Sequence, residues 1–169
     1  VPTFSRVSET KKFLNSVNSS INKDYKVLII DDHPDQVTLK SVQQTNRVKI
    51  FSSEKELWWV GSINLGIQKI FDKYSLKDED TIIFANNDIE IDKHSFELLY
   101  REHKENYFQI IHPRTFNQNG VEVSSGAKIL SYFPYITKHP KNFLEQKTFI
   151  DMGTARFLMM SGSVLKKVG

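Results

Sequence analysis

The chain has 169 residues, of which 39% are hydrophobic and 25% are charged. This is the length of one domain and the composition of a globular protein, which excludes disordered and fibrous classes. There is no cysteine, so disulfides and thiolate metal sites are excluded, and the composition fits a reducing compartment. The formal net charge is only +3, with basic residues scattered among acidic ones, so no nucleic-acid partner is expected.

No apolar run reaches the length of a membrane span. The longest runs, such as residues 27–30, are strand-sized, whereas a membrane helix needs about 20 apolar residues. Residues 1–6 lack the apolar stretch of a signal peptide. We expect a cytoplasmic protein, and the small basic excess is compatible with peripheral association at the inner face of a membrane.

Helices and strands alternate in the first half of the chain. Apolar residues recur at three- and four-residue steps over 8–20, which predicts an amphipathic helix that Ser8 can cap. A continuous apolar run at 25–30 predicts a buried parallel strand, and residues 47–51 predict a second short strand. Residues 34–35 are expected to open a short helix or turn between these two strands.

The second half continues this alternation. Apolar side chains on one helical face predict a helix at 61–74, and the run at 81–85 predicts a buried strand. Residues 115–149 are rich in Asn, Gly, Ser and Pro and are expected to be irregular, a loop length that usually serves a site. The remaining expected elements are a helix at 94–105, a strand at 108–111, a strand at 157–160 and a helix beginning at 163. The alternation predicts one α/β domain with a mainly parallel sheet.

Two of the predicted strands end in acids or amides. Asp31 and Asp32 follow one strand, and Asn86, Asn87 and Asp88 follow another. In parallel α/β sheets, ligands bind beyond the carboxyl ends of the strands. One acid at such a place often only caps the next helix, but two clusters at the same edge favour a binding site. We expect Asp32 and Asp88 to converge on a shared rim.

These residue types suit a nucleotide with a diphosphate. The negative charges of a diphosphate need a hard divalent cation, and Mg²⁺ or Mn²⁺ takes carboxylate, phosphate and water oxygens. Asp88 is the candidate ligand, whereas Asn86 and Asn87 are neutral and can hydrogen-bond a ribose or a water. Asp32 can accept the N–H of a uracil or thymine, a bond worth about 1.5–3 kcal/mol. Phe4 can stack on the base.

Five segments in order resemble glycosyltransferase family 2. Residues 1–6, Val-Pro-Thr-Phe-Ser-Arg, are similar to the end of that family's first strand. Residues 57–67, with Trp-Trp-x-Gly-x-x-Asn-x-Gly-Ile, and residues 84–89, with Asn-Asn-Asp as a version of the Asp-x-Asp metal motif, are similar to rhamnosyltransferase-type members. Residues 153–160 and 164–169 are similar to a later strand and helix. Each segment alone is a weak signal, but five in register are a strong one.

The resemblance implies a Rossmann-like GT-A fold over 1–169 that binds a UDP- or dTDP-sugar with Mg²⁺ or Mn²⁺. The sugar would pass to a hydroxyl of a saccharide or lipid-linked saccharide, in surface polysaccharide synthesis. The implied nucleotide-binding residues are Pro2, Thr3, Phe4, Arg6, Asp31, Asp32, Gly61, Asn64, Asn86 and Asn87. The implied metal ligand is Asp88, and the loops expected near the donor sugar and the acceptor contain Gly126, Gly153 and Thr154.

Two positions depart from the family's pattern. Ile63 stands where many members carry an Arg before the Asn. The corresponding diphosphate contact is either missing or supplied by Arg6, Arg47 or Lys55. Asn86 replaces the first Asp of the metal motif, which leaves fewer charged ligands for a cation.

The resemblance also implies that the domain is truncated at both ends. Val1 corresponds to the last residue of a central first strand, so a gap in the sheet is expected beside it. The Asp or Glu that deprotonates the acceptor in inverting members is expected beyond Gly169, so no catalytic base is expected in this chain. Such a chain is expected to bind the donor better than it transfers sugar.

Two other functions stay open. Residues 26–35 resemble the acidic opening of a phospho-receiver domain, which also binds Mg²⁺. A receiver begins at this strand, however, and needs an Asp after the next core strand, where this chain has Ala85 and Asn86. The other alternative is a catalytically inert domain that binds a sugar nucleotide, which is favoured if Asp88 binds no metal.

The tryptophans and histidines have structural interpretations. Trp58 and Trp59 are expected to anchor the core or a loop rather than to stack on a sugar. The five histidines are spread along the chain without metal-ligand spacing, so a histidine metal site is not expected.

Overall fold

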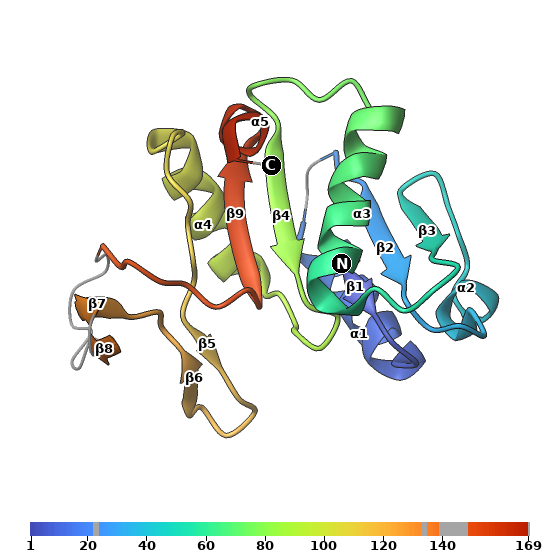
Figure 1. The fold of residues 1–169 in the computed structure, drawn as a ribbon, viewed down its shortest axis with the longest axis horizontal. Coiled ribbons are helices and arrows are strands. Elements are labelled where there is room, and N and C mark those ends of the chain that lie inside the picture. Colours follow the sequence, from blue (N-terminus) through green and yellow to red (C-terminus); the bar gives the residue numbers. More distant parts are fainter. Residues whose placement is uncertain (22–23, 133–134, 139–148, 169) are drawn as a thin grey trace.

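A computed structural model describes residues 1–21, 24–132, 135–138 and 149–168 (Figure 1). The elements are β1 (Pro2–Thr3), α1 (Val7–Ser20), β2 (Val27–Asp31), α2 (Val37–Ser41), β3 (Val48–Ser52), α3 (Trp58–Lys73), β4 (Thr81–Ala85), α4 (Lys93–Glu105), β5 (Thr115–Phe116), β6 (Glu122–Ser124), β7 (Lys128–Tyr132), β8 (Tyr135–Lys138), β9 (Phe157–Ser161) and α5 (Gly162–Val168). Strands and helices alternate as far as α4, so the predicted α/β class is confirmed.

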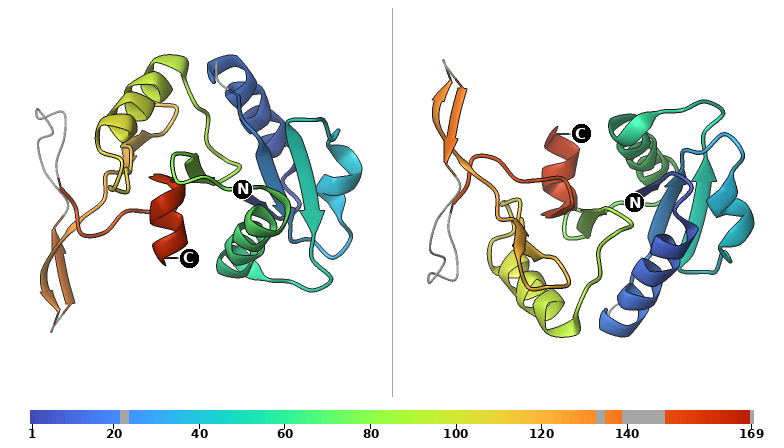
Figure 2. Two further views of the ribbon diagram at one scale, coloured as in Figure 1. Left: turned by 90° about the horizontal axis from the view of Figure 1, so that it is seen from above. Right: turned by 90° about the horizontal axis from the view of Figure 1, so that it is seen from below.

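The first sheet is parallel and has the order β1-β2-β3. Its middle strand is rich in β-branched side chains, and Ile29 and Ile30 are 0% and 1% exposed, as expected for a strand covered on both faces. The helices α1 and α3 lie on opposite faces of this sheet in both views of Figure 2. α3 contacts β1 and β2, and α1 contacts α2 and α4. The parallel part of the predicted sheet is therefore present.

The second sheet pairs β4 with β9 in antiparallel register, from Thr81 opposite Ser161 to Ala85 opposite Phe157. β4 has the predicted bounds. The antiparallel direction of β9 was not anticipated, because an apolar strand carries no sign of its direction in its own side chains.

A cavity of about 700 Å³ lies between the two sheets. Val1 and Leu28 line one side, and Ile83 and Phe84 line the other. The amino group of Val1 donates to the carbonyl of Leu28 at 2.9 Å, and burial lowers the pKa of this amino group to about 5. The cavity therefore lies beside Val1.

Two hairpins lie to one side of the two sheets (Figures 1 and 2). β5 pairs with β6 and β7 pairs with β8, both antiparallel. The side-chain oxygen of Asn117 accepts from the backbone of Asn119 and Val121, and Gly120 at φ +76° completes the first turn. The prediction of an irregular 115–149 is wrong for these hairpins, whereas residues 133–134 and 139–148 lie outside the described residues.

Three local predictions are also wrong. Residues 108–111 form no strand, because only Ile111 makes a bridge, to Met159. α1 begins at Val7, and its N-cap Arg6 makes no side-chain cap bond, so Ser8 lies inside the helix. α3 begins at Trp58 rather than at residue 61.

Among the described residues, no helix combines the length and the apolarity needed to cross a membrane.

Candidate functional site

Thr3 joins the two acidic clusters that follow β2 and β4. Its carbonyl accepts from the backbone N–H of Asp32 at 3.0 Å, and its hydroxyl accepts from the side-chain amide of Asn87 at 3.0 Å. The arrowheads of β2 and β4 in Figure 1 point toward the same end of the domain. The structure thus brings the Asp32 and Asp88 loops to one edge.

A buried set of polar side chains holds this edge together. Thr3, Thr10 and Asn87 are 4%, 0% and 5% exposed. The amide of Asn87 donates to the hydroxyls of Thr3 and Thr10, and the Thr10 hydroxyl donates to the carbonyl of Arg6. Satisfied buried networks of this kind make a region rigid. Thr3 and Asn87, both expected to contact a nucleotide, therefore face each other and position their neighbours.

Asp31 and Asp32 serve different purposes. Asp31 is fully buried, and its two oxygens accept from the backbone N–H groups of His33 and Leu39, so it secures the turn and α2. Asp32 is 5% exposed, and its Oδ1 accepts from the N–H of Leu57 at 2.7 Å. Its Oδ2 has no hydrogen bond to another described residue. Both oxygens of Asp31 are therefore used within the protein, whereas Asp32 has one oxygen that can accept a hydrogen bond from a ligand.

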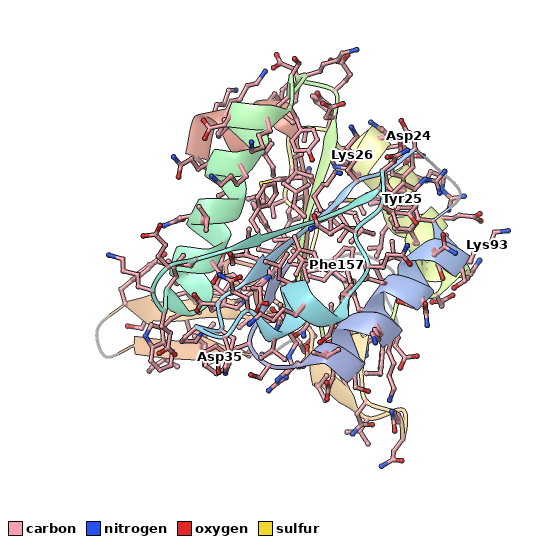
Figure 3. All side chains as sticks on the ribbon, turned by 90° about the vertical axis from the view of Figure 1, so that its right-hand side faces the viewer. Asp24, Tyr25, Lys26, Asp35, Lys93 and Phe157 are labelled. Atoms are coloured by element: carbon pink, nitrogen blue, oxygen red, sulfur yellow. The ribbon has the colours of Figure 1, made fainter. Side chains whose placement is uncertain are left out.

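An aromatic pair lies beside Asp32. The ring of Phe4 is 46% exposed, and its centroid lies 4.8 Å from that of His33. The backbone N–H of Asp35 donates to Nδ1 of His33, which holds the imidazole in its turn. Figure 3 shows Asp35 at one end of the domain and Asp24 and Lys26, which precede β2, at the other. His33 was not predicted, although its position directly after the acidic pair could have suggested it.

Asp88 is ion-paired with Arg6. Nη1 of Arg6 lies 3.2 Å from Oδ2 of Asp88, and the two side chains are 56% and 31% exposed. No group of three His, Cys, Asp or Glu side chains that could hold a metal occurs within the described part of the chain. One accessible carboxylate still fits Mg²⁺ or Mn²⁺ when phosphate oxygens and water complete the coordination. Such a metal would be shared with a phosphate-bearing ligand.

Asn86 is held by a tryptophan. Its side-chain oxygen accepts from Nε1 of Trp59 at 2.9 Å, and its backbone N–H donates to the carbonyl of Arg156. This leaves the amide N–H groups of Asn86 for a ligand. Trp59 is 37% exposed and anchors the loop through this hydrogen bond, which is one of the two structural roles predicted for the tryptophans. Trp58 is 73% exposed, has φ +58° and is not part of the hydrophobic core.

The other predicted nucleotide residues have weaker ties to the edge. Pro2 pairs with Ile30 in the sheet and is partly buried. Gly61 lies in the first turns of α3, where an added Cβ would come within 2.8 Å of Leu57. Asn64 is exposed on α3, and no described contact joins it to the acidic clusters.

The structure separates the three cations considered for a diphosphate. Arg6 lies beside Asp88. Arg47 stacks on the ring of Tyr25, which Figure 3 shows at the opposite end of β2 from Asp35. Lys55 is exposed in the loop that leads to α3. Arg6 is therefore the cation adjacent to the metal motif.

The three residues predicted near the donor sugar and acceptor line one pocket of about 310 Å³. Gly126, Gly153 and Thr154 contribute to its wall together with Ser124. Gly126 has φ +77°, and an added Cβ would come within 2.7 Å of the carbonyl of Met152. The hydroxyls of Ser124 and Thr154 are 2.7 Å apart.

His112 lies behind these hydroxyls. Its Nε2 is 3.0 Å from the hydroxyl of Thr154 and 3.5 Å from that of Ser124, while its buried Nδ1 has no partner among the described residues. Burial lowers the pKa of His112, so the ring is neutral at neutral pH. Thr154 lies two residues before Arg156, whose carbonyl accepts from the backbone N–H of Asn86, so a short segment connects the pocket to the metal motif. The sequence offered no signal for His112 or Ser124.

Comparison with known proteins agrees with this geometry. The model of the family described as glycosyl transferase family 2 matches residues 1–169. It includes residues 26–35, so the receiver interpretation is set aside. The match is to the family as a whole and does not single out rhamnosyltransferase-type members. A search of curated proteins gave no matching relative. The chain belongs to glycosyl transferase family 2, a family of glycosyltransferase enzymes with the GT-A type of α/β fold.

Proposed function

We propose that this chain binds a UDP- or dTDP-sugar at the edge formed by β1, β2 and β4, together with Mg²⁺ or Mn²⁺, for transfer of the sugar to an acceptor hydroxyl. The observation that carries the proposal is the shared attachment of the Asp32 and Asp88 loops to Thr3. This attachment keeps a base-binding acid and a metal-binding acid at a constant separation. A nucleoside diphosphate matches this arrangement, because its base and its phosphates lie at opposite ends of the molecule.

The base lies against Phe4 and His33 and reaches Asp32. Stacking on an aromatic ring contributes about 1–3 kcal/mol per base. The oxygen of Asp32 that Leu57 leaves unused accepts the N3–H of uracil or thymine, and a hydrogen bond to a charged group contributes about 1.5–3 kcal/mol. Guanine also offers an N–H, at N1, so we expect the preference for uridine and thymidine over guanosine to come from the smaller one-ring base.

The diphosphate lies between Arg6 and Asp88. Asp88 holds the cation jointly with phosphate oxygens, and the cation, when bound, offsets the charge that develops on the departing diphosphate. Arg6 lies beside Asp88, and its side chain is more than half exposed. It therefore has room to move from Asp88 to a phosphate oxygen. Both groups act on the leaving group, which is where charge grows during transfer.

The acceptor hydroxyl must lose a proton as its oxygen attacks C1 of the sugar. We assign this proton transfer to none of the described side chains and propose that the base comes from outside these 169 residues. Saccharide or lipid-linked saccharide acceptors and a role in surface polysaccharide synthesis rest on the resemblance of residues 57–67 alone. A cytoplasmic setting at the inner membrane face rests on the absence of cysteine and the small basic excess.

Calorimetry with UDP, dTDP and GDP, each with and without Mn²⁺, tests the proposal. We expect UDP or dTDP to bind at least about tenfold more tightly than GDP, and Mn²⁺ to strengthen that binding. Asp32→Asn should weaken the binding of UDP and dTDP, and Asp88→Asn should remove the effect of Mn²⁺. Asp24→Asn, at the far end of the domain, is the matched control (Figure 3). Equal affinity for all three nucleotides would contradict the proposed site.

One observation favours a second candidate, a sugar-nucleotide-binding domain that works without a metal. Arg6 already compensates the charge of Asp88, and the described residues form no group of three His, Cys, Asp or Glu side chains that could hold a metal. Under this alternative, nucleotide affinity is the same with and without Mn²⁺ in the unmodified chain and in Asp88→Asn. A sugar-transfer assay tests the proposed origin of the base. Turnover by these 169 residues would contradict the proposal that the base comes from outside them.

A further inference from the structure

The pocket lined by Ser124 and Thr154 has no role in binding the nucleotide as proposed above. We call it the hydroxyl pocket, and its wall includes Glu122, Ser124, Gly126, Met152, Gly153 and Thr154. Its volume of about 310 Å³ falls at the lower end of the range for small-ligand sites. This volume suits a ligand the size of one small ring rather than a whole nucleotide.

The chemistry of the wall is hydroxylic and apolar. The hydroxyls of Ser124 and Thr154 meet at 2.7 Å, and each can both donate and accept. Glu122 is the charged residue of the wall, and it is ion-paired with Arg114. A phosphate would need cations that this wall lacks. A sugar ring, with alternating hydroxyl and C–H surfaces, matches both kinds of lining.

The pocket is also shaped by residues that leave little freedom. Gly126 has φ +77° and no room for a Cβ beside Met152. A Cβ at Gly153 would come within 3.0 Å of the imidazole of His112. Nε2 of His112 in turn contacts the hydroxyl of Thr154 at 3.0 Å, which restrains that side chain. Preformed hydrogen-bonding groups lower the entropy cost of binding.

The location ties the pocket to the nucleotide site. The segment from Thr154 leads into β9 and includes Arg156, whose carbonyl accepts from the backbone N–H of Asn86. Asn86 is in the same loop as Asp88, where we propose that the diphosphate lies. The donor sugar attached to that diphosphate, and an acceptor whose hydroxyl attacks C1 of the donor sugar, therefore lie in the neighbourhood of the hydroxyl pocket.

We propose that the hydroxyl pocket holds one sugar ring, through hydrogen bonds from the hydroxyls of Ser124 and Thr154, and that His112 is the positioning residue for both hydroxyls. The proposal rests on the proposed function, since that function places a sugar at this edge. It goes further by naming the residues that recognise the ring. The ring is either the sugar of the donor or a sugar of the acceptor, and the two sources share this chemistry.

The first experiment compares the unmodified chain with Thr154→Val and Ser124→Ala, which remove one hydroxyl each at nearly constant volume. Affinities for UDP, UDP-glucose, UDP-galactose and UDP-N-acetylglucosamine are measured with Mg²⁺ by calorimetry. If the ring belongs to the donor, each variant binds the best UDP-sugar about tenfold more weakly and binds UDP unchanged. Ser19→Ala, which removes an exposed hydroxyl on α1, is the matched control.

The second arm uses saturation-transfer NMR with the methyl glycosides of glucose, galactose, rhamnose and N-acetylglucosamine in the presence of UDP and Mg²⁺. If the ring belongs to the acceptor, a glycoside receives saturation from the unmodified chain and loses most of it with Thr154→Val. If the variants match the unmodified chain in both arms, or if no sugar is bound in either, the pocket proposal is overturned. Failure of UDP itself to bind is the separate result that contradicts the nucleotide site.

His112 is tested by a pair of variants. His112→Phe keeps a ring but removes both nitrogens, so sugar affinity should fall as it does in Thr154→Val while UDP affinity stays constant. In His112→Gln an amide nitrogen can contact the Thr154 hydroxyl, so part of the sugar affinity should return. A purely structural role predicts equal losses for sugar and UDP, a lower melting temperature and no rescue by Gln, and that result would remove His112 from the proposal.

Discussion

The nucleotide edge and the hydroxyl pocket are built in different ways. At the edge, Asn87 donates to Thr3 and Thr10, which precede it by 84 and 77 residues, so most of the polar groups there hold the loops together. In the pocket, Ser124 and Thr154 present their hydroxyls in the wall, and His112 supports them from behind. Polar residues at a strand end are thus not all ligand contacts. The buried members keep the exposed members in position.

The largest expected effect comes from breaking the edge. Asn87→Ala leaves the buried hydroxyls of Thr3 and Thr10 without their shared donor. We expect the free energy of unfolding to fall by about 1–3 kcal/mol and nucleotide binding to be lost with it, as measured by urea denaturation and calorimetry. Asn15→Ala, at an exposed position of α1, is the control. Wild-type stability in Asn87→Ala would show that the network is not what holds the edge.

The next effect is confined to the pocket. Gly126→Ala places a Cβ at φ +77° against the carbonyl of Met152, which should cost about 1–2 kcal/mol of unfolding free energy. Sugar binding should weaken while UDP binding is retained. Gly120→Ala offers a comparison, since it has a similar φ of +76° but no atom within 4 Å of the added Cβ. Equal losses in the two variants would mean that strain alone, and not contact with the pocket wall, is responsible.

A helix cap outside both regions provides a baseline of about 1 kcal/mol. The Asp92 carboxylate accepts from the backbone N–H groups of His94 and Ser95, and hydrogen bonding to Ser95 is the main reason that its pKa is lowered. A lowered folded-state pKa means that this stability is present above the unfolded pKa and is lost as pH falls through the folded pKa. Asp92→Ala should therefore cost stability at pH 7 and little under strongly acidic conditions. Denaturation at a series of pH values measures this, and a pH-independent loss would contradict it.

The smallest effect on stability should come from Arg6. The ion pair with Asp88 is largely exposed, and such pairs contribute at most about 1 kcal/mol. Arg6→Gln should leave unfolding nearly unchanged and strengthen the binding of Mn²⁺ alone by a few-fold, because Asp88 loses its competing partner. Electron paramagnetic resonance of free Mn²⁺ measures this. Weaker Mn²⁺ binding in the variant would contradict competition at Asp88.

Much of the fold could be read from local patterns. The apolar run at β4 and the three- and four-residue periodicity of α1 predicted those elements closely, because burial of a strand or of one helical face leaves a repeating signal. The start of α3 was missed, since Trp58, Trp59 and Val60 are exposed and add no buried side chain to the apolar face that predicted the helix. The hairpins were missed because their strands are short and their faces are mostly exposed.

The candidate site was predicted less completely. The Asp32 and Asp88 loops were expected at one edge, which follows from the common direction of parallel strands. The individual roles were not accessible, because Asp31 and Asp32 are equivalent in sequence and differ only in which backbone N–H groups they meet. The roles of His33 and His112 were overlooked because they depend on contacts with Phe4 and Thr154, which are distant in the chain.

The sequence by itself determined the α/β class, the family and the positions at which acids, amides and glycines leave the strands. Only the tertiary structure decided that Asn87 is buried, that Arg6 pairs with Asp88 and that His112, Ser124 and Thr154 meet. The reason is physical: periodicity and motif spacing reflect interactions between near neighbours in the chain. Hydrogen bonds between residues dozens of positions apart depend on how strands and loops pack, and no local pattern records that packing.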